Sequence, residues 1–177
     1  QTCALPISLL ARKQCLAPRT SNFNGRNIMR SDTIIYFAYG ANLNKHGMDN
    51  RCLGNKPLCR AILKNYRLVF KNVADIEEAT NHYVQGALYE INRDHLVSLD
   101  RFEGYPRLYT RTIVPVFTEH GKEIYAVVYK MTTRNQYSRP HQGYLNIIIS
   151  GCRQWQLPEE YIQYIITRAN EPNFGET

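Results

Sequence analysis

The chain has 177 residues, a length that favours one hydrophobic core, with or without a tail, over two full domains. Its formal charge of +7 would suit a nucleic-acid or membrane partner, but five of its 22 basic residues and none of its 15 acidic ones lie in residues 1–30. The other 17 basic residues face 15 acidic ones, a net charge of only +2 over 31–177. We therefore expect neither a nucleic acid nor a membrane as partner.

Residues 1–30 show no sustained hydrophobic periodicity and would form no core of their own. Their apolar piece, Ala4–Ala11, is far shorter than the roughly 18 residues that a membrane span needs. A basic, acid-free start is compatible with an organellar transit peptide, but we favour a disordered or non-native leader with Met29 as the natural start. We expect a leader over 1–30 and a single domain over 31–177, in a cytoplasmic protein.

The first predicted element is a short buried strand, Thr33–Tyr39, because its residues are β-branched and aromatic. Gly40 ends this strand, and Asn42 is placed to cap a helix over 43–52. Residues 58–72 follow with partly alternating apolar positions, typical of one long strand or two consecutive ones. The polar stretch 73–82 is predicted to be a linker, with Glu77 and Glu78 on a solvated face.

The second half of the chain alternates further strands with helices at its centre and its end. Asn92 opens a helix that runs through Phe102, and Gly104 closes it as a C-terminal cap. Pro115 inside a later strand indicates an edge or a bend. Strands grouped in runs favour an α+β fold, a small mixed β-barrel-like domain, over a doubly wound parallel sheet. The elements expected here are strands at 83–91, 109–118 and 122–131 and helices at 92–102, 140–155 and from 158 onward.

Most common enzyme motifs are absent from the sequence. It has no Ser-His-Asp set, no P-loop, no GxGxxG and no paired histidines. The five cysteines are an odd number, and Cys52 and Cys59 are too far apart for a zinc knuckle. We expect free buried thiols, no metal and no cofactor.

Two features remain as candidate sites. The first is the joint after the first strand, where Tyr36, Tyr39, Gly40 and Ala41 precede a helix whose free N–H groups would attract an anion. Spacing alone favours the simpler alternative, an ordinary strand-helix turn packed with aromatic residues.

The second candidate is Glu103, a carboxylate flanked by aromatic residues at a predicted helix end. Burial among them would raise its pKa and let it exchange protons near neutral pH, although a helix-end Glu in water is the simpler alternative. Asp100, one turn earlier, is interpreted as a structural hydrogen-bond acceptor.

Three segments in order resemble the gamma-glutamylcyclotransferase family, which includes AIG2-like and butirosin-pathway cyclotransferases. They are "YFAYGANL" from Tyr36, "LDRFEGYPRLYTR" around Glu103, and "PHQGYLNIIISGC" around Tyr144, and the resemblance covers nearly all of 33–170. The family's "YGSN" loop has Ala41 here in place of its usual Ser. Any family contact that needs this hydroxyl would be lost.

The resemblance implies a small β-barrel with flanking helices and a pocket at one barrel mouth. It implies a cofactor-independent enzyme that releases 5-oxoproline and an amine from a small γ-glutamyl substrate, with Glu103 as general acid and base. The implied substrate contacts are Tyr36, Tyr39, Gly40, Ala41, Asn42, Leu43, Tyr109 and Tyr144. The alternative is a non-catalytic relative that keeps the pocket to bind a small ligand or a partner. A monomer or a homodimer, and several leaving amines, remain open.

Overall fold

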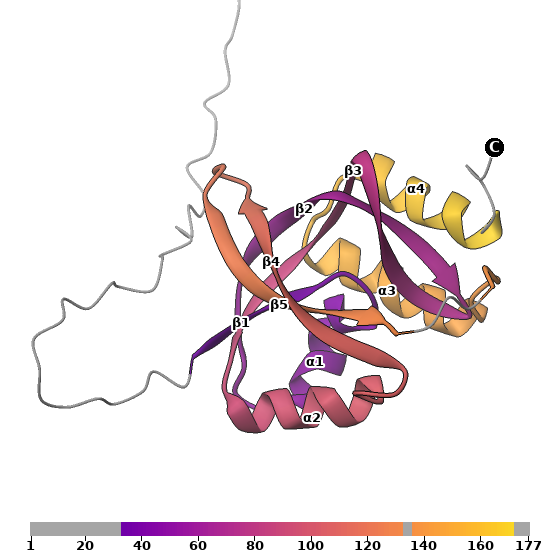
Figure 1. Ribbon diagram of the computed structural model, residues 1–177. Helices are drawn as coiled ribbons and strands as arrows, with labels where there is room; N and C mark the ends of the chain where they lie inside the picture. The colour runs from indigo at the N-terminus through magenta and orange to yellow at the C-terminus, as the bar shows by residue number, and fades with distance from the viewer. Residues whose placement is uncertain (1–32, 133–135, 172–177) are drawn as a thin grey trace, which may run out of the picture.

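The computed structural model describes residues 33–132 and 136–171. The expected leader, 1–30, lies outside the described residues. Five strands form a closed barrel in the order β1-β3-β2-β4-β5 (Figure 1). Strand β1 pairs in parallel with β5 and antiparallel with β3, and all other neighbours are antiparallel. The strands are β1 (Ile34–Ala38), β2 (Lys56–Lys71), β3 (Val73–Ile91), β4 (Tyr109–Thr118) and β5 (Glu123–Met131).

Four α-helices and one short 3-10 turn surround the barrel. Helices α1 and α2 lie together at one end, while α3 and α4 cover another side (Figure 1). The predicted α+β barrel with flanking helices is therefore confirmed. Helix α2 is capped as expected, because Asn92 accepts from the backbone N–H of His95 and Gly104 adopts a left-handed φ of 67°. The elements are η1 (Ala41–Leu43), α1 (Lys45–Arg51), α2 (Arg93–Glu103), α3 (Gln142–Gln154) and α4 (Glu159–Asn170).

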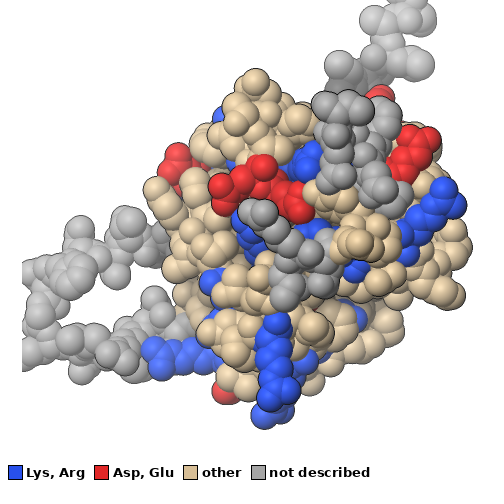
Figure 2. All heavy atoms as spheres, turned by 45° about the vertical axis from the view of Figure 1, so that its right-hand side comes forward, with Lys and Arg blue, Asp and Glu red and all other residues tan. Residues whose placement is uncertain are grey.

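The linker predicted over 73–82 is wrong, because these residues belong to β3, which forms one long hairpin with β2. Polar side chains fit this strand because the neighbouring strand supplies partners: Lys71 lies 2.9 Å from both Asp75 and Glu77. Acidic and basic side chains lie side by side on the face shown in Figure 2. The solvated face predicted for Glu77 is therefore also wrong.

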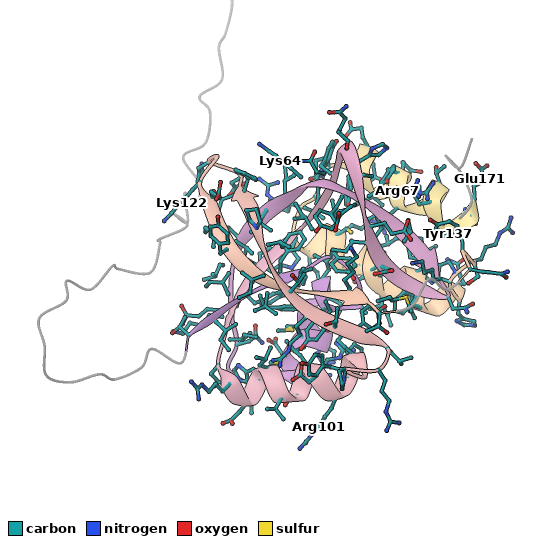
Figure 3. The ribbon with its side chains drawn as sticks, viewed as in Figure 1. Lys64, Arg67, Arg101, Lys122, Tyr137 and Glu171 are labelled. Atoms are coloured by element: carbon teal, nitrogen blue, oxygen red, sulfur yellow. The ribbon has the colours of Figure 1, made fainter. Side chains whose placement is uncertain are left out.

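Arg67 and Tyr137 complete this charged cluster near the hairpin turn (Figure 3). The Arg67 guanidinium and the Tyr137 hydroxyl both donate to one oxygen of Glu77, at 3.2 and 2.7 Å. Glu78, by contrast, has a side chain 74% exposed, as the sequence predicts. Hydrophobic periodicity predicts a linker over 73–82 because most of these residues are polar. It does not reveal the cross-strand pairs with β2 that allow them to form a strand.

Pro115 lies where the sequence indicates an edge. Strand β4 pairs with β5 along its length but with β2 only at Phe117 and Thr118. Pro115 is therefore bonded on one side only, and the proline costs no second ladder bond. Of the described cysteines, Cys52 and Cys152 are buried free thiols as expected. Cys59 is disulfide-bonded, so the expectation of free thiols is wrong for that residue.

Candidate active site

A cavity of about 180 Å³ opens where the end of β1, the end of α2 and the start of β3 meet. It collects eight of the nine residues that the sequence predicts for the site. The exception is Leu43, which is fully buried in the core and whose carbonyl accepts a hydrogen bond from the Trp155 indole at 3.0 Å. The eight that line the cavity are Tyr36, Tyr39, Gly40, Ala41, Asn42, Glu103, Tyr109 and Tyr144.

The loop after β1 is built differently from the predicted strand-helix joint. A 3-10 turn, Ala41–Leu43, separates the strand from α1, whose N-cap is Asn44 and not Asn42. The Asn44 side chain accepts from the backbone N–H of Gly47 at 2.9 Å. The predicted cap is thus wrong by two residues, and Asn42 is freed to face the cavity. The cavity is lined by the 3-10 turn and not by the first turn of α1, so the anion site expected at this joint stays a prediction and would involve residues 40–42.

Asn42 connects the loop to the carboxylate. Its Nδ2 donates to the Tyr36 hydroxyl at 2.8 Å and to Oε1 of Glu103 at 2.9 Å. The Asn42 side chain is almost fully buried, and its Oδ1 has no hydrogen-bond partner among the described residues. This amide therefore fixes the position of Glu103 and keeps an acceptor oxygen without a partner.

Glu103 is the last residue of α2, immediately before the left-handed Gly104 that ends the helix. Burial raises the pKa of Glu103 from 4.5 to about 7, while the positive charge of Arg51 and the hydrogen bond from Asn42 oppose the rise. Desolvation outweighs both, because no cation contacts the carboxylate directly among the residues that the structure describes. A carboxyl group with this pKa can accept and return a proton near neutral pH.

Tyr109 and Tyr144 both bind the backbone of Ala74 at the start of β3. The Tyr109 hydroxyl donates to the Ala74 carbonyl at 2.7 Å, and the Ala74 N–H donates to the Tyr144 hydroxyl at 3.1 Å. Burial raises the pKa of Tyr144 to about 12, and hydrogen bonds from the backbone of Ala74 and Ala41 limit the rise. Both phenols are therefore neutral near pH 7 and are held at the cavity wall.

Helix α3 carries Tyr144 to the loop because Gly151 allows a close approach. A Cβ at Gly151 would lie 2.6 Å from the backbone of Leu43 and Asn44, a distance that real side chains do not tolerate. The helix backbone therefore packs directly on the loop. Tyr144 therefore lines the cavity, as predicted for this helix segment. The close packing at Gly151 that brings it there is not visible in the hydrophobic periodicity of the sequence.

Sequence reasoning missed five lining residues: Val73, Ala74, Phe102, Leu108 and Tyr129. The first two were hidden because 73–82 reads as a linker. Tyr129 lies on β5 and donates from its hydroxyl to Asp100 at 2.7 Å, which makes Asp100 the structural acceptor that the sequence indicates. Strand alternation would not have found Tyr129, because its neighbour Val128 is buried as well and β5 does not alternate there.

The parts of the chain that the structure describes contain no group of three His, Cys, Asp or Glu side chains able to hold a metal ion. Within the same ranges, no helix is long and apolar enough to cross a membrane. The chemistry that this cavity offers rests on a single carboxyl group, surrounded by an amide and neutral phenols. A barrel with such a pocket is typical of the class of enzymes that act on small molecules.

Comparison with known proteins places the chain within that class. The family described as "Gamma-glutamyl cyclotransferase, AIG2-like" matches residues 36–147. A human gamma-glutamylcyclotransferase is 32% identical over 155 residues, 80% of this chain and 81% of the relative. The mouse gamma-glutamylcyclotransferase is 29% identical over 167 residues, 87% of each chain. A solved structure of a gamma-glutamyl cyclotransferase matches with a TM-score of 0.72 at 30% identity, covering 76% of this chain and 86% of that one.

The chain therefore belongs to the gamma-glutamyl cyclotransferase, AIG2-like family, and it is an enzyme of that class. This membership agrees with the resemblance of its three sequence motifs.

Proposed function

We propose that the substrate is a γ-glutamyl amine or a γ-glutamyl amino acid and that the products are 5-oxoproline and the free amine. The observation that carries this proposal is Glu103, a buried carboxyl group with a pKa of about 7 at the wall of the cavity. A reaction that moves one proton off an amine and onto another needs a group of this kind. The family membership and the curated relatives support the same reaction.

The proposed reaction is an intramolecular aminolysis. Glu103 takes a proton from the α-ammonium group of the glutamyl part, and the resulting amine attacks the γ-carbonyl carbon of the same substrate. A new N–C bond closes the five-membered lactam, and the bond from the γ-carbon to the leaving nitrogen breaks. Protonated Glu103 then returns this proton to the leaving nitrogen as that bond breaks. The attacking nitrogen loses a second proton when the lactam forms, and Glu103, again ionised, passes it to the released amine, which departs as its ammonium form. Two protons thus move from the attacking to the leaving nitrogen, and the step needs no enzyme nucleophile, water or cofactor.

The rest of the site is proposed to hold the substrate folded. The loop residues Gly40, Ala41 and Asn42 would bind the α-carboxylate and orient the γ-carbonyl. Tyr109 and Tyr144 would contact the glutamyl part from the opposite wall. Well-oriented intramolecular reactions reach effective molarities of about 10⁵ to 10⁸ M, so positioning supplies much of the acceleration.

Tyr36, on β1, and Tyr39, in the loop after it, are expected from the sequence to contact substrate. Both line the cavity, but their hydroxyls bond to the protein: Tyr36 accepts from Asn42, and Tyr39 donates to the carbonyl of Tyr129 at 2.8 Å. We propose that both shape the cavity wall. Ala41 contacts Tyr144 through its backbone, and this supports the proposal that the loop needs no serine hydroxyl at this position.

A binding-only relative is the alternative. It would gain nothing from a buried carboxyl group left without a direct cation, whose desolvation destabilises the folded protein. The catalytic proposal explains this group, and the enzyme class of the family agrees with it.

The test is incubation of the full chain with γ-glutamyl dipeptides, glutathione and γ-glutamyl amines, followed by mass-spectrometric detection of 5-oxoproline. We expect release of 5-oxoproline and the matching amine from at least one of these series. Absence of 5-oxoproline from every substrate, with a folded protein, would contradict the proposal. Release that persists in Glu103→Ala would contradict the role of Glu103 alone.

A further inference from the structure

Arg51, the last residue of α1, lies against the end of α2. Its guanidinium carbon is 3.7 Å from the centre of the Phe102 ring, and Phe102 lines the cavity directly before Glu103. Gly47, one turn earlier on α1, provides the room: a Cβ at that position would lie 2.8 Å from Arg51 Nη1. The Arg51 guanidinium thus packs on the Phe102 ring and occupies the space that Gly47 leaves free on α1.

The guanidinium is not paired in the way that buried arginines usually are. Its Nη1 is buried and has no hydrogen-bond partner within the described ranges, and no direct ion pair joins Arg51 to Glu103 there. A buried donor without a partner costs free energy, so a structural role would favour a residue without this group. Burial lowers the pKa of Arg51, and the largest opposing influence is the charge of Glu103.

We propose that Arg51 is a positioning residue that acts through Glu103: held on Phe102, the residue before Glu103, it raises the share of Glu103 that is ionised near neutral pH and ready to accept a proton. This inference rests on the proposed role of Glu103. Arg51 acts on Glu103 without forming a direct ion pair with it among the described residues, and this arrangement suits that role. A direct bidentate pair would stabilise the carboxylate too strongly for it to accept a proton, whereas burial with no cation would leave it protonated at neutral pH.

The other groups that act on Glu103 are phenols and one amide. Five tyrosines, on β1, in the loop after it and on β4, β5 and α3, interact electrostatically with Glu103: Tyr36, Tyr39, Tyr109, Tyr129 and Tyr144. Burial raises the pKa of every one of them, so all are neutral near pH 7. Cys52, which faces Arg51, is also neutral because burial raises its pKa to about 11. Among the described groups that act on Glu103, Arg51 therefore supplies the positive charge.

The experiment measures the pKa of Glu103 directly. Carbon-13 NMR of the full chain with labelled glutamate side chains follows the carboxyl signal that disappears in Glu103→Gln. The pH dependence of kcat/KM for 5-oxoproline release is recorded on the same proteins. Arg51→Met removes the charge and keeps an unbranched side chain, Arg51→Lys keeps the charge, and Arg101→Met is the matched control. Arg101 is exposed on the last turn of α2 and points away from the barrel (Figure 3).

In Arg51→Met the pKa of Glu103 is expected to rise by about one unit, the lower end of the range for removing a nearby opposite charge. The acid limb of kcat/KM should move by the same amount, so that activity below pH 7 falls about tenfold while the alkaline plateau stays unchanged. Arg51→Lys should restore both values, and Arg101→Met should leave both as in the wild type. A structural role would instead lower the plateau at every pH.

An unchanged Glu103 signal in Arg51→Met, or an equal shift in Arg101→Met, would overturn the inference. If Arg51→Met does not fold by circular dichroism, Arg51→Gln is measured in its place with the same criteria. The NMR titration needs no turnover, so it tests the effect of Arg51 on the pKa of Glu103 even if no substrate is found. Absence of 5-oxoproline in the wild type would therefore count against the proposed function, and an unshifted pKa would count against Arg51 alone.

Discussion

Two neighbouring parts of the barrel bury carboxylates in opposite ways. Near the turn between β2 and β3, Glu77 and Asp75 each contact the ammonium group of Lys71 at 2.9 Å. At the end of α2, Glu103 accepts one hydrogen bond from the Asn42 amide. The cation that acts on it is Arg51, which forms no direct ion pair with Glu103 among the described residues. Ala74 is adjacent to both parts, since it precedes Asp75 and lines the cavity.

The consequences for protonation are opposite. Burial raises the pKa of Glu77, but hydrogen bonds from Tyr137 and Lys71 outweigh it and lower the pKa below 4.5. For Glu103 burial prevails, and the pKa rises to about 7. The lowered pKa keeps the paired Glu77 ionised at neutral pH. The carboxyl group without a direct cation is the one poised for proton transfer.

The largest effect is expected from removing the proton carrier. Glu103→Gln keeps the shape and the hydrogen bond from Asn42 but cannot take up a proton, so kcat should fall by about 10² to 10⁴ with KM nearly unchanged. Release of 5-oxoproline under saturating substrate gives the measurement. Glu78→Gln, which changes an exposed carboxylate on β3, is the control and should retain full activity. Equal losses in both variants would remove the distinction between the two parts.

The paired region should show its importance in stability. Lys71→Met leaves the buried Asp75 without the cation that it shares with Glu77, and loss of one partner of a buried pair costs about 3 to 5 kcal/mol. Urea unfolding followed by circular dichroism measures this change. Lys64→Met removes an exposed charge from the same strand and should change the free energy of unfolding by less than about 0.5 kcal/mol. A Lys71 variant as stable as the wild type would show that the cluster is dispensable.

The pH dependence of stability should have opposite signs in the two parts. Glu103 binds its proton more tightly when folded, so its contribution is complete below pH 4.5 and is lost as the pH rises to about 7. Glu103→Gln should therefore gain about 2 to 3 kcal/mol relative to the wild type between pH 5 and pH 8.

Glu77, whose pKa is lowered, contributes stability above pH 4.5 that is lost as the pH falls through its folded value. Glu77→Gln should consequently be less stable than the wild type at pH 8, with a smaller difference in acid. Thermal unfolding of both variants at several pH values tests the pair. Curves that change in the same direction would contradict the comparison.

The smallest effect concerns the contact between the two parts. Tyr144→Phe removes the acceptor of the Ala74 N–H, which should cost about 1 kcal/mol of stability and raise KM about fivefold if the hydroxyl also contacts substrate. Thermal unfolding and initial rates measure the two quantities. Tyr125→Phe, on an exposed part of β5, is the control and should change neither. An unchanged KM would assign Tyr144 a structural role only.

Local chemistry determined much of what the sequence predicts. The first strand, the two strands of the second hairpin, α2 with its caps at Asn92 and Gly104, and the two C-terminal helices all follow from alternation, composition and capping residues within short windows. Glu103 stood out for the same reason, because aromatic neighbours and a helix end are visible in its immediate sequence. The ordered motifs then indicated the family and most of the residues that line the cavity.

Only the tertiary structure decided the rest, because the deciding partners are far apart in the chain. Residues 73–82 form a strand since cations of β2 neutralise their carboxylates, and no local pattern contains both members of such a pair. Asn42 does not cap α1 because the 3-10 turn Ala41–Leu43 moves the helix start to Lys45, and its Nδ2 instead donates to Tyr36 and to a carboxylate 61 residues away. The pKa of Glu103 follows from desolvation, which depends on the whole barrel closing around it and not on any neighbour in sequence.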